Sequence, residues 1–215
     1  PDLGAGYIEW TLKPTYLGRY LRTQDRMIVQ TIRDVNWSQP TYFAVTVAPE
    51  NKIGLERYLE MQGLVYELMP YPARPINIER LRHNLLEVYR YRNLDDPSIY
   101  YNPNIQRLMQ NLRASFLQLA MDGIIKGQKE QAKAILDTLA ATIPESVIPI
   151  RNKDLYFQIG ELYAEAGDTT ELRRRLTVIP GRFGLVPGDH LRIGYMYSRY
   201  LNDWESAQAI FDNLY

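Results

Sequence analysis

Two short segments in the last third of the chain repeat each other, and this repeat constrains the fold more than any other feature. The segment Ile159–Tyr163 (IGELY) is followed by Ile193–Tyr197 (IGYMY), so glycine and tyrosine recur after 34 residues (194 − 160 and 197 − 163). A period of about 34 residues with a small residue and an aromatic residue at these offsets is typical of tetratricopeptide helix hairpins. Such hairpins bury their apolar faces only by stacking, and a stack presents a groove that can bind a polypeptide.

The repeat pattern predicts three stacked helical hairpins. They cover residues 104–144, 153–180 and 188–215. We expect Gly160 and Gly194 to let paired helices approach closely, because a glycine has no side chain to separate them. We expect Tyr163 and Tyr197 to fill the space between successive hairpins. The connection that begins at Pro180 is irregular, because this proline comes earlier than the repeat pattern requires.

The N-terminal part of the chain is predicted to contain shorter elements. Residues 1–22, with glycines that include Gly4 and Gly6, show no sustained period and look like an extended lead-in. The predicted elements that follow are a helix over 23–36, a strand over 41–47, a short helix over 53–61, a strand over 64–69, and helices over 77–91 and 104–126. Two short strands are too few for an independent sheet protein. The expected fold is therefore mainly α, with a small α/β cap at 1–75 followed by a tetratricopeptide-like helical stack at 76–215.

Composition and charge exclude several classes of protein. Twenty-five basic side chains balance twenty-five acidic ones, whereas nucleic acid or an anionic membrane surface would require a clustered positive excess. The densest basic cluster, Arg173–Arg175, is expected to form a solvated helix face. The chain has no cysteine, which rules out disulfides and thiolate metal sites, and it has no apolar run that approaches the ~20 residues of a membrane-spanning helix.

The sequence offers no candidate for a catalytic, metal or cofactor site. His83 lies in a charged helical segment where solvent exposure is expected, and His190 stands alone beside Asp189. Neither histidine has a second ligand at metal-binding spacing, and no glycine-rich phosphate loop or nucleophile elbow is present.

The acidic residues on predicted helices also lack the arrangement that catalysis requires. Glu56 and Glu60 form one i,i+4 pair and Glu161 and Glu165 form another, and both pairs are expected on exposed faces. A glycosidase would instead need two carboxylates that face each other across a cleft. We therefore expect that this chain is not itself an enzyme.

Three blocks in the chain resemble a known family. The segment Asn36–Ala44 (NWSQPTYFA) resembles the Asn-Trp-x-x-Pro-x-Tyr-Phe-Ala block of a large family of bacterial multi-pass membrane proteins, long catalogued as a domain of unknown function. Tyr58–Pro70 (YLEMQGLVYELMP) and Asn111–Ala120 (NLRASFLQLA) resemble two further blocks of that family, in the same order. The chain departs from the family at Ser38 and Gln39, where basic residues are usual.

The resemblance implies a location and a parent protein. The membrane part of that family is related to protein O-mannosyltransferases, and its acidic catalytic residue lies in a loop of the membrane part. The chain then corresponds to the periplasmic, or extracytoplasmic, C-terminal region, and no catalytic residue is carried over to it. Because it begins at Pro1 and shows no signal peptide, we expect it to be a piece of a longer protein. In the Asn36–Ala44 block, Tyr42 and Ala44 are expected on one strand face and Phe43 on the other.

Two functions from different classes fit these observations best. The first is a non-catalytic accessory domain of a membrane glycosyltransferase-like protein, which docks an acceptor or partner polypeptide beside the parent's own membrane domain. The second is a stand-alone extracytoplasmic scaffold without glycosyl chemistry. A carbohydrate-binding or hydrolytic protein is a third alternative, and it depends only on the seventeen tyrosines. If the groove binds a peptide, its lining should come from polar positions on the first helix of each hairpin, which are Gln118, Asp122, Gln158, Glu161, Arg192 and Tyr195.

Overall fold

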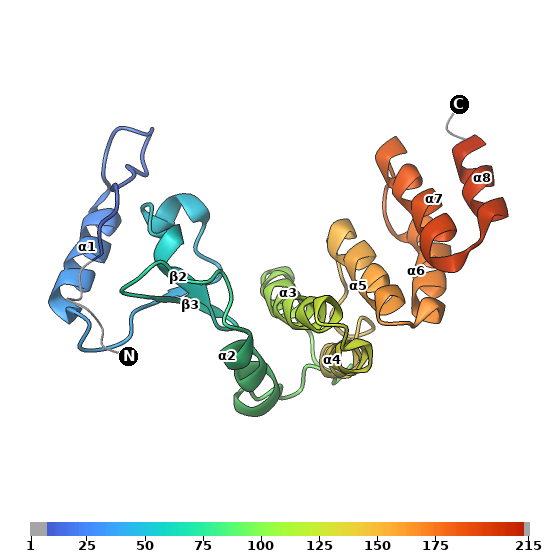
Figure 1. The fold of residues 1–215 in the computed structure, drawn as a ribbon, viewed down its shortest axis with the longest axis horizontal. Coiled ribbons are helices and arrows are strands. Elements are labelled where there is room, and N and C mark those ends of the chain that lie inside the picture. The colour runs from blue at the N-terminus through green and yellow to red at the C-terminus, as the bar shows by residue number, and fades with distance from the viewer. Residues whose placement is uncertain (1–7, 213–215) are drawn as a thin grey trace. The chain divides into compact units, whose positions relative to one another are not determined.

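The computed structural model describes residues 8–212 and divides the chain into two compact units, one that extends to Arg90 and one that begins at Tyr91. The protein is mainly helical, with a small sheet in the N-terminal unit and a stack of paired helices in the C-terminal unit (Figure 1), which confirms the expected fold class. The predictions for Gly4 and Gly6 and for the last three residues of the third hairpin lie outside the described residues.

The first unit is built around a three-stranded antiparallel sheet in the order β1-β3-β2. Phe43 pairs with Tyr66 between β1 and β3, and Leu59 pairs with Leu68 between β2 and β3. The elements of this unit are α1 (Thr23–Val35), β1 (Tyr42–Ala44), two 3₁₀ turns (Pro49–Lys52 and Glu56–Tyr58), β2 (Leu59–Met61), β3 (Val65–Leu68), α2 (Ile78–His83) and a π-helical turn (Asn84–Val88).

The strand β2 corrects one prediction, because residues 53–61 were expected to form a helix. Ile53 and Gly54 both have positive φ, of 51° and 91°, and this backbone conformation ends the first 3₁₀ turn. The chain then pairs with β3, so that Glu60 is buried at 4% exposure rather than exposed on a helix beside Glu56. Its carboxylate accepts a hydrogen bond of 2.8 Å from the Asn77 side chain, which compensates for its burial.

The strand faces predicted for the Asn36–Ala44 block are confirmed. Helix α1 ends at Val35, and Asn36 takes a left-handed conformation with φ of 42°. On β1, Phe43 is buried in the core of the unit while Tyr42 and Ala44 face outward. Ile28 and Ile32 of α1 pack against the same core, so this block joins the helix to the sheet.

The single helix predicted over residues 77–91 is interrupted. Helix α2 ends at His83, and the backbone continues as a π-helical turn to Val88. The Asn77 side chain begins α2 by accepting the Arg80 backbone N–H at 3.0 Å. Contacts group these residues with the first unit, which continues to Arg90.

Replacing Gly54 with alanine is expected to destabilise the first unit. An alanine Cβ would lie 2.7 Å from the backbone oxygen of Thr11, and the φ of 91° disfavours any residue with a side chain. We expect a loss of about 2 kcal/mol in the free energy of unfolding, measured in urea. Gly18 has φ of 66° but no atom within 4 Å of the position that an added Cβ would take, so Gly18→Ala should cost less, and equal losses would contradict the steric argument.

The described part of the second unit contains six helices in three antiparallel pairs, coloured from yellow-green to red in Figure 1. Helix α3 packs against α4, α5 against α6, and α7 against α8, while α3 and α7 also contact α5. No helix among residues 8–212 is both long and apolar enough to cross a bilayer. The helices are α3 (Pro103–Ile125), α4 (Lys129–Thr142), α5 (Lys153–Glu165), α6 (Thr169–Arg182), α7 (Pro187–Leu201) and α8 (Trp204–Asp212).

Both glycines that were expected between paired helices lie there. Gly160 is buried, and a Cβ on it would be 3.1 Å from the Leu172 side chain of α6. Gly194 faces Phe211 of α8 still more closely, at 2.4 Å from its Cε1. Tyr163 is buried and Tyr197 is half-buried. The glycine contacts explain the 34-residue recurrence of glycine as close packing within each hairpin.

The second hairpin extends further than predicted. Pro180 lies inside α6, which continues to Arg182. A proline lacks the backbone N–H that would bond one turn back, but the Phe183 N–H still reaches the Ile179 carbonyl at 3.1 Å. The helix therefore tolerates the proline in its last turn.

Candidate functional site

A polar groove crosses the first helices of the hairpins. It has a volume of about 320 Å³, and Gln158 and Glu161 of α5 and Arg192 of α7 line it together with Met121 of α3. Asp154, Leu162 and Glu165 complete the lining. The structure thus brings together three of the six residues that the sequence assigned to partner binding.

Arg192 forms ion pairs with acidic side chains of the groove. Its guanidinium donates to both carboxylate oxygens of Glu161, at 2.8 and 3.2 Å, and lies 3.4 Å from Asp154. It also stacks on the ring of Phe157, 4.6 Å from the centroid. Such a two-point pair fixes the orientation of both side chains. Of the three carboxylates that line the groove, Arg192 pairs with those of Asp154 and Glu161.

The other three predicted residues lie on the same helices but do not line this groove. Gln118 is half-buried on α3, and Asp122 pairs with Lys126 at 2.8 Å. Tyr195 is 53% exposed, one turn after Arg192 on α7, and its ring meets Tyr200 edge-on with centroids 6.3 Å apart.

Tyr200 connects this aromatic pair to the acidic side of the groove. Its hydroxyl donates to Glu165 at 3.0 Å. Burial, followed by this hydrogen bond, raises the pKa of Tyr200 above its ordinary value. The phenol therefore stays protonated and remains a donor to Glu165 at neutral pH.

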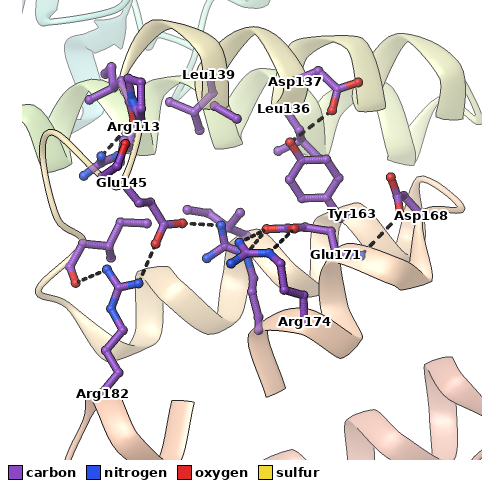
Figure 2. Close-up of a pocket in the computed structure, with 17 residues that line it drawn as sticks. Arg113, Leu136, Asp137, Leu139, Glu145, Tyr163, Asp168, Glu171, Arg174 and Arg182 are labelled. Carbon is purple, nitrogen blue, oxygen red and sulfur yellow. Dashed lines mark hydrogen bonds and ion pairs between the residues drawn. The ribbon is translucent and has the colours of Figure 1, made fainter. Parts of the chain in front are cut away.

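A second cavity, which we call the arginine cavity, lies within the first two hairpins and was not predicted (Figure 2). Its volume is about 520 Å³. Its wall is apolar where Leu136, Leu139 and Ile143 contribute and strongly charged elsewhere. The charged residues that line it are Arg113, Asp137, Glu145, Asp168, Glu171, Arg174, Arg175 and Arg182.

Glu145, in the loop between α4 and α5, is the central carboxylate of the arginine cavity. It pairs with Arg175 and Arg182 of α6, and the Arg182 contact measures 2.7 Å. Burial alone raises the pKa of Glu145, but the charges and hydrogen bonds of the two arginines outweigh it and lower the pKa below the ordinary value of 4.5. Glu145 is therefore ionised at neutral pH.

Two arginines fix the loop that follows α4. Arg113 of α3 is 1% exposed and donates to the carbonyls of Ile143, at 3.0 Å, and Ile148. Arg182 donates to the Ile150 carbonyl at 3.2 Å. Burial lowers the pKa of Arg113 to about 10, so its guanidinium still carries a charge at neutral pH. Loop carbonyls buried in this way need such donors.

Arg175 and Arg182 also contact an aromatic ring. Their guanidinium carbons lie 4.5 and 4.7 Å from the ring centroid of Tyr156, which is fully buried on α5. Stacking of guanidinium on a tyrosine ring is favourable when both are desolvated. The Nε of Arg175 donates to Glu171 at 2.8 Å, while Arg174 binds both oxygens of Glu171 at 2.7 Å.

The opposite end of the arginine cavity is acidic. The Tyr163 hydroxyl donates to Asp137 at 3.2 Å, and Lys133 lies 2.8 Å from Asp137 and 3.4 Å from Asp168. Burial, followed by the charge of Asp137, raises the pKa of Tyr163. Asp168 also begins α6 by accepting the Glu171 backbone N–H at 3.4 Å. Both carboxylates thus have partners within the protein.

The position of Arg175 corrects the expectation that Arg173–Arg175 forms a solvated face. Arg173 and Arg174 are exposed, but Arg175 is only 5% exposed. The burial of Arg175 could have been predicted from the sequence, because Arg175 falls on the apolar stripe of α6 with Leu172 and Leu176. The partners of Arg175 could not be predicted in this way, since Glu145 lies 30 residues away.

Neither histidine enters either site. His83 is exposed, as expected, and its Nδ1 lies 2.8 Å from Glu87. His190 contacts the Val186 carbonyl at the start of α7. Within residues 8–212, no three histidine, cysteine or acidic side chains are grouped so as to hold a metal ion.

The described residues define a helical-hairpin protein that carries a small α/β unit before its stack. Comparison with family models adds that residues 4–84 match TMEM260-associated domain 2. TMEM260 is a membrane glycosyltransferase-like protein, so this match agrees with the resemblance carried by the blocks at 36–44 and 58–70. No curated protein and no solved structure matches the chain significantly.

Proposed function

We propose that this chain is a non-catalytic accessory region of a membrane glycosyltransferase-like protein, and that its helical stack docks an acceptor or partner polypeptide on the extracytoplasmic side. The observation that supports this most is the groove, where Gln158, Glu161 and Arg192 converge from two hairpins. The match of residues 4–84 to a TMEM260-associated domain supports the connection to a membrane protein.

The chemistry of the groove suits recognition of an extended chain. Gln158 can both donate and accept hydrogen bonds, and the carboxylates of Glu161 and Glu165 accept them. The ion pair between Arg192 and Glu161, with Arg192 stacked on the Phe157 ring, fixes these two side chains before a partner arrives, which lowers the conformational entropy lost on binding.

A stand-alone scaffold remains the alternative, because a stack of hairpins alone would support it. The two functions differ in their relation to a membrane domain and to sugar transfer. Full-length parent protein, with and without the stack, should be assayed for transfer from a lipid-linked sugar donor to polypeptide. Turnover by the isolated chain would contradict a non-catalytic role, and activity of the parent that does not depend on the stack would favour the scaffold.

Replacing Tyr195 with alanine is expected to weaken partner capture without unfolding the stack. The side chain is 53% exposed beside the groove, and aromatic anchors at interfaces contribute about 2 kcal/mol, or about a 30-fold change in affinity. Capture should be measured by pull-down from the extracytoplasmic fraction, followed by titration of the retained protein. Tyr100, which is 82% exposed and does not line the groove, provides the control; equal losses for Tyr100→Ala and Tyr195→Ala would show that this face is not the docking surface.

A further inference from the structure

We propose that the arginine cavity is a binding site for a phosphate group, either free or carried by a larger molecule. The charged end of the cavity contains four guanidiniums, those of Arg113, Arg174, Arg175 and Arg182. Among residues 8–212, only two carboxylates, those of Glu145 and Glu171, pair with them. Within the described part of the chain, two positive charges are therefore uncompensated at this end.

The unpaired donor of Arg175 supports the same conclusion. Its side chain is 7% exposed, and Nε and Nη2 are paired with Glu171 and Glu145. Its Nη1 is buried and has no hydrogen-bond partner among the described residues. A buried donor without an acceptor is rare and unfavourable, and this one adds to the excess of donors over acceptors at the arginine end.

The carboxylates at the acidic end of the cavity do not repel an anion bound at the arginine end, because they are paired and lie away from it. Asp137 and Asp168 share Lys133, and Asp137 also accepts from Tyr163. These interactions occupy both carboxylates at the acidic end of the cavity, Asp137 of α4 and Asp168 at the start of α6. Figure 2 shows Asp137 and Asp168 on one side and Glu145 and Arg182 on the other, so an anion at the arginines lies away from them.

The size and openness of the cavity suit such a ligand. Arg174 is 54% exposed and Arg182 is 25% exposed, so the arginine end is open to solvent. A volume of about 520 Å³ leaves room for a phosphate and an organic body beside Ala140 and Pro144, the accessible apolar part of the lining. Arginine is suited to phosphate because its planar guanidinium can donate two parallel hydrogen bonds.

The proposal is tested by titrating the protein with inorganic phosphate at constant ionic strength, with chloride as the balancing ion. We expect a saturable rise of about 2–4 °C in Tm at phosphate concentrations well above Kd. Because loss of Arg175 itself could unfold the stack, Arg174→Gln is the test variant, and it should lose at least half of the phosphate-dependent rise. Arg173→Gln removes an equal charge from the neighbouring residue outside the cavity and should retain the full rise.

Two outcomes would overturn the proposal. A rise in Tm that does not saturate and is equal in all three proteins would mean that phosphate acts only through exclusion from the protein surface. Acetate carries a single charge and should raise Tm by less than half as much at the same concentration. An equal effect of acetate would assign the cavity to carboxylates rather than phosphate.

Discussion

Replacing Glu145 with alanine is expected to lower the free energy of unfolding of the helical stack by about 2–3 kcal/mol. The change would leave Arg175 and Arg182 in the arginine cavity without their shared carboxylate, and removal of one partner from a fully buried pair costs about 3–5 kcal/mol. Glu145 retains 22% exposure, which places the expected loss below that range. Urea denaturation of the two proteins measures it. Glu130→Ala removes an exposed glutamate of α4 and should cost less than about 1 kcal/mol.

The pH dependence of the protein's stability distinguishes a charge effect of Glu145 from a packing effect. Because the pKa of Glu145 is lower in the folded protein than its ordinary value of 4.5, its ionisation stabilises the folded state above pH 4.5. That stabilisation is lost as the pH falls below 4.5 through the folded-state pKa. Stability of the unmodified protein should therefore fall more steeply below pH 4.5 than that of Glu145→Gln. Parallel pH profiles would show that the ion pairs contribute no net stability.

Replacing Gly194 with alanine is expected to destabilise the third hairpin by about 2 kcal/mol, because an added Cβ would lie 2.4 and 2.6 Å from Cε1 and Cζ of Phe211. The ring must move or the helices must separate, and overpacking of this kind costs about 1–3 kcal/mol. Thermal and urea unfolding measure the change. Gly181→Ala is the matched control within a helix, since no atom lies within 4 Å of the added Cβ; it should be neutral or stabilising by up to about 1 kcal/mol.

If Gly194→Ala proved as harmless as Gly181→Ala, α7 and α8 would not be held at the separation described here. The 34-residue recurrence of glycine would then need an explanation other than close helix packing. A double variant with Phe211→Leu separates the two possibilities, because the smaller side chain should restore part of the stability lost in Gly194→Ala.

The helical stack could be predicted because its signal is local and periodic. Each hairpin has an apolar stripe along its helices, and Gly127 and Gly167 mark two turns with positive φ, at 73° and 96°. Strand β2 could not be predicted in the same way. It has only three residues, Leu59–Met61, and it forms because β3 provides the pairing partner, which no pattern within residues 59–61 reveals.

The two sites differ in how far the sequence could reveal them. Gln158, Glu161 and Arg192 could be named from the sequence because they fall off the apolar stripe of the first helices. The arginine cavity depends on contacts between residues 30 or more positions apart, such as Arg175 with Glu145 and Arg113 with Ile148. A buried arginine on an apolar stripe indicates that a partner exists, but the partner's position is set by the loop conformation.

The loop between α4 and α5 has a mechanical consequence for recognition. Arg113 and Arg182 hold three of its carbonyl groups from helices on either side of it, so this connection lacks the freedom of a hinge. A bound polypeptide would therefore contact an α3–α5 surface of fixed curvature. Selectivity would then arise because chains that do not fit this surface are excluded, and not because the hairpins change their arrangement to fit the chain.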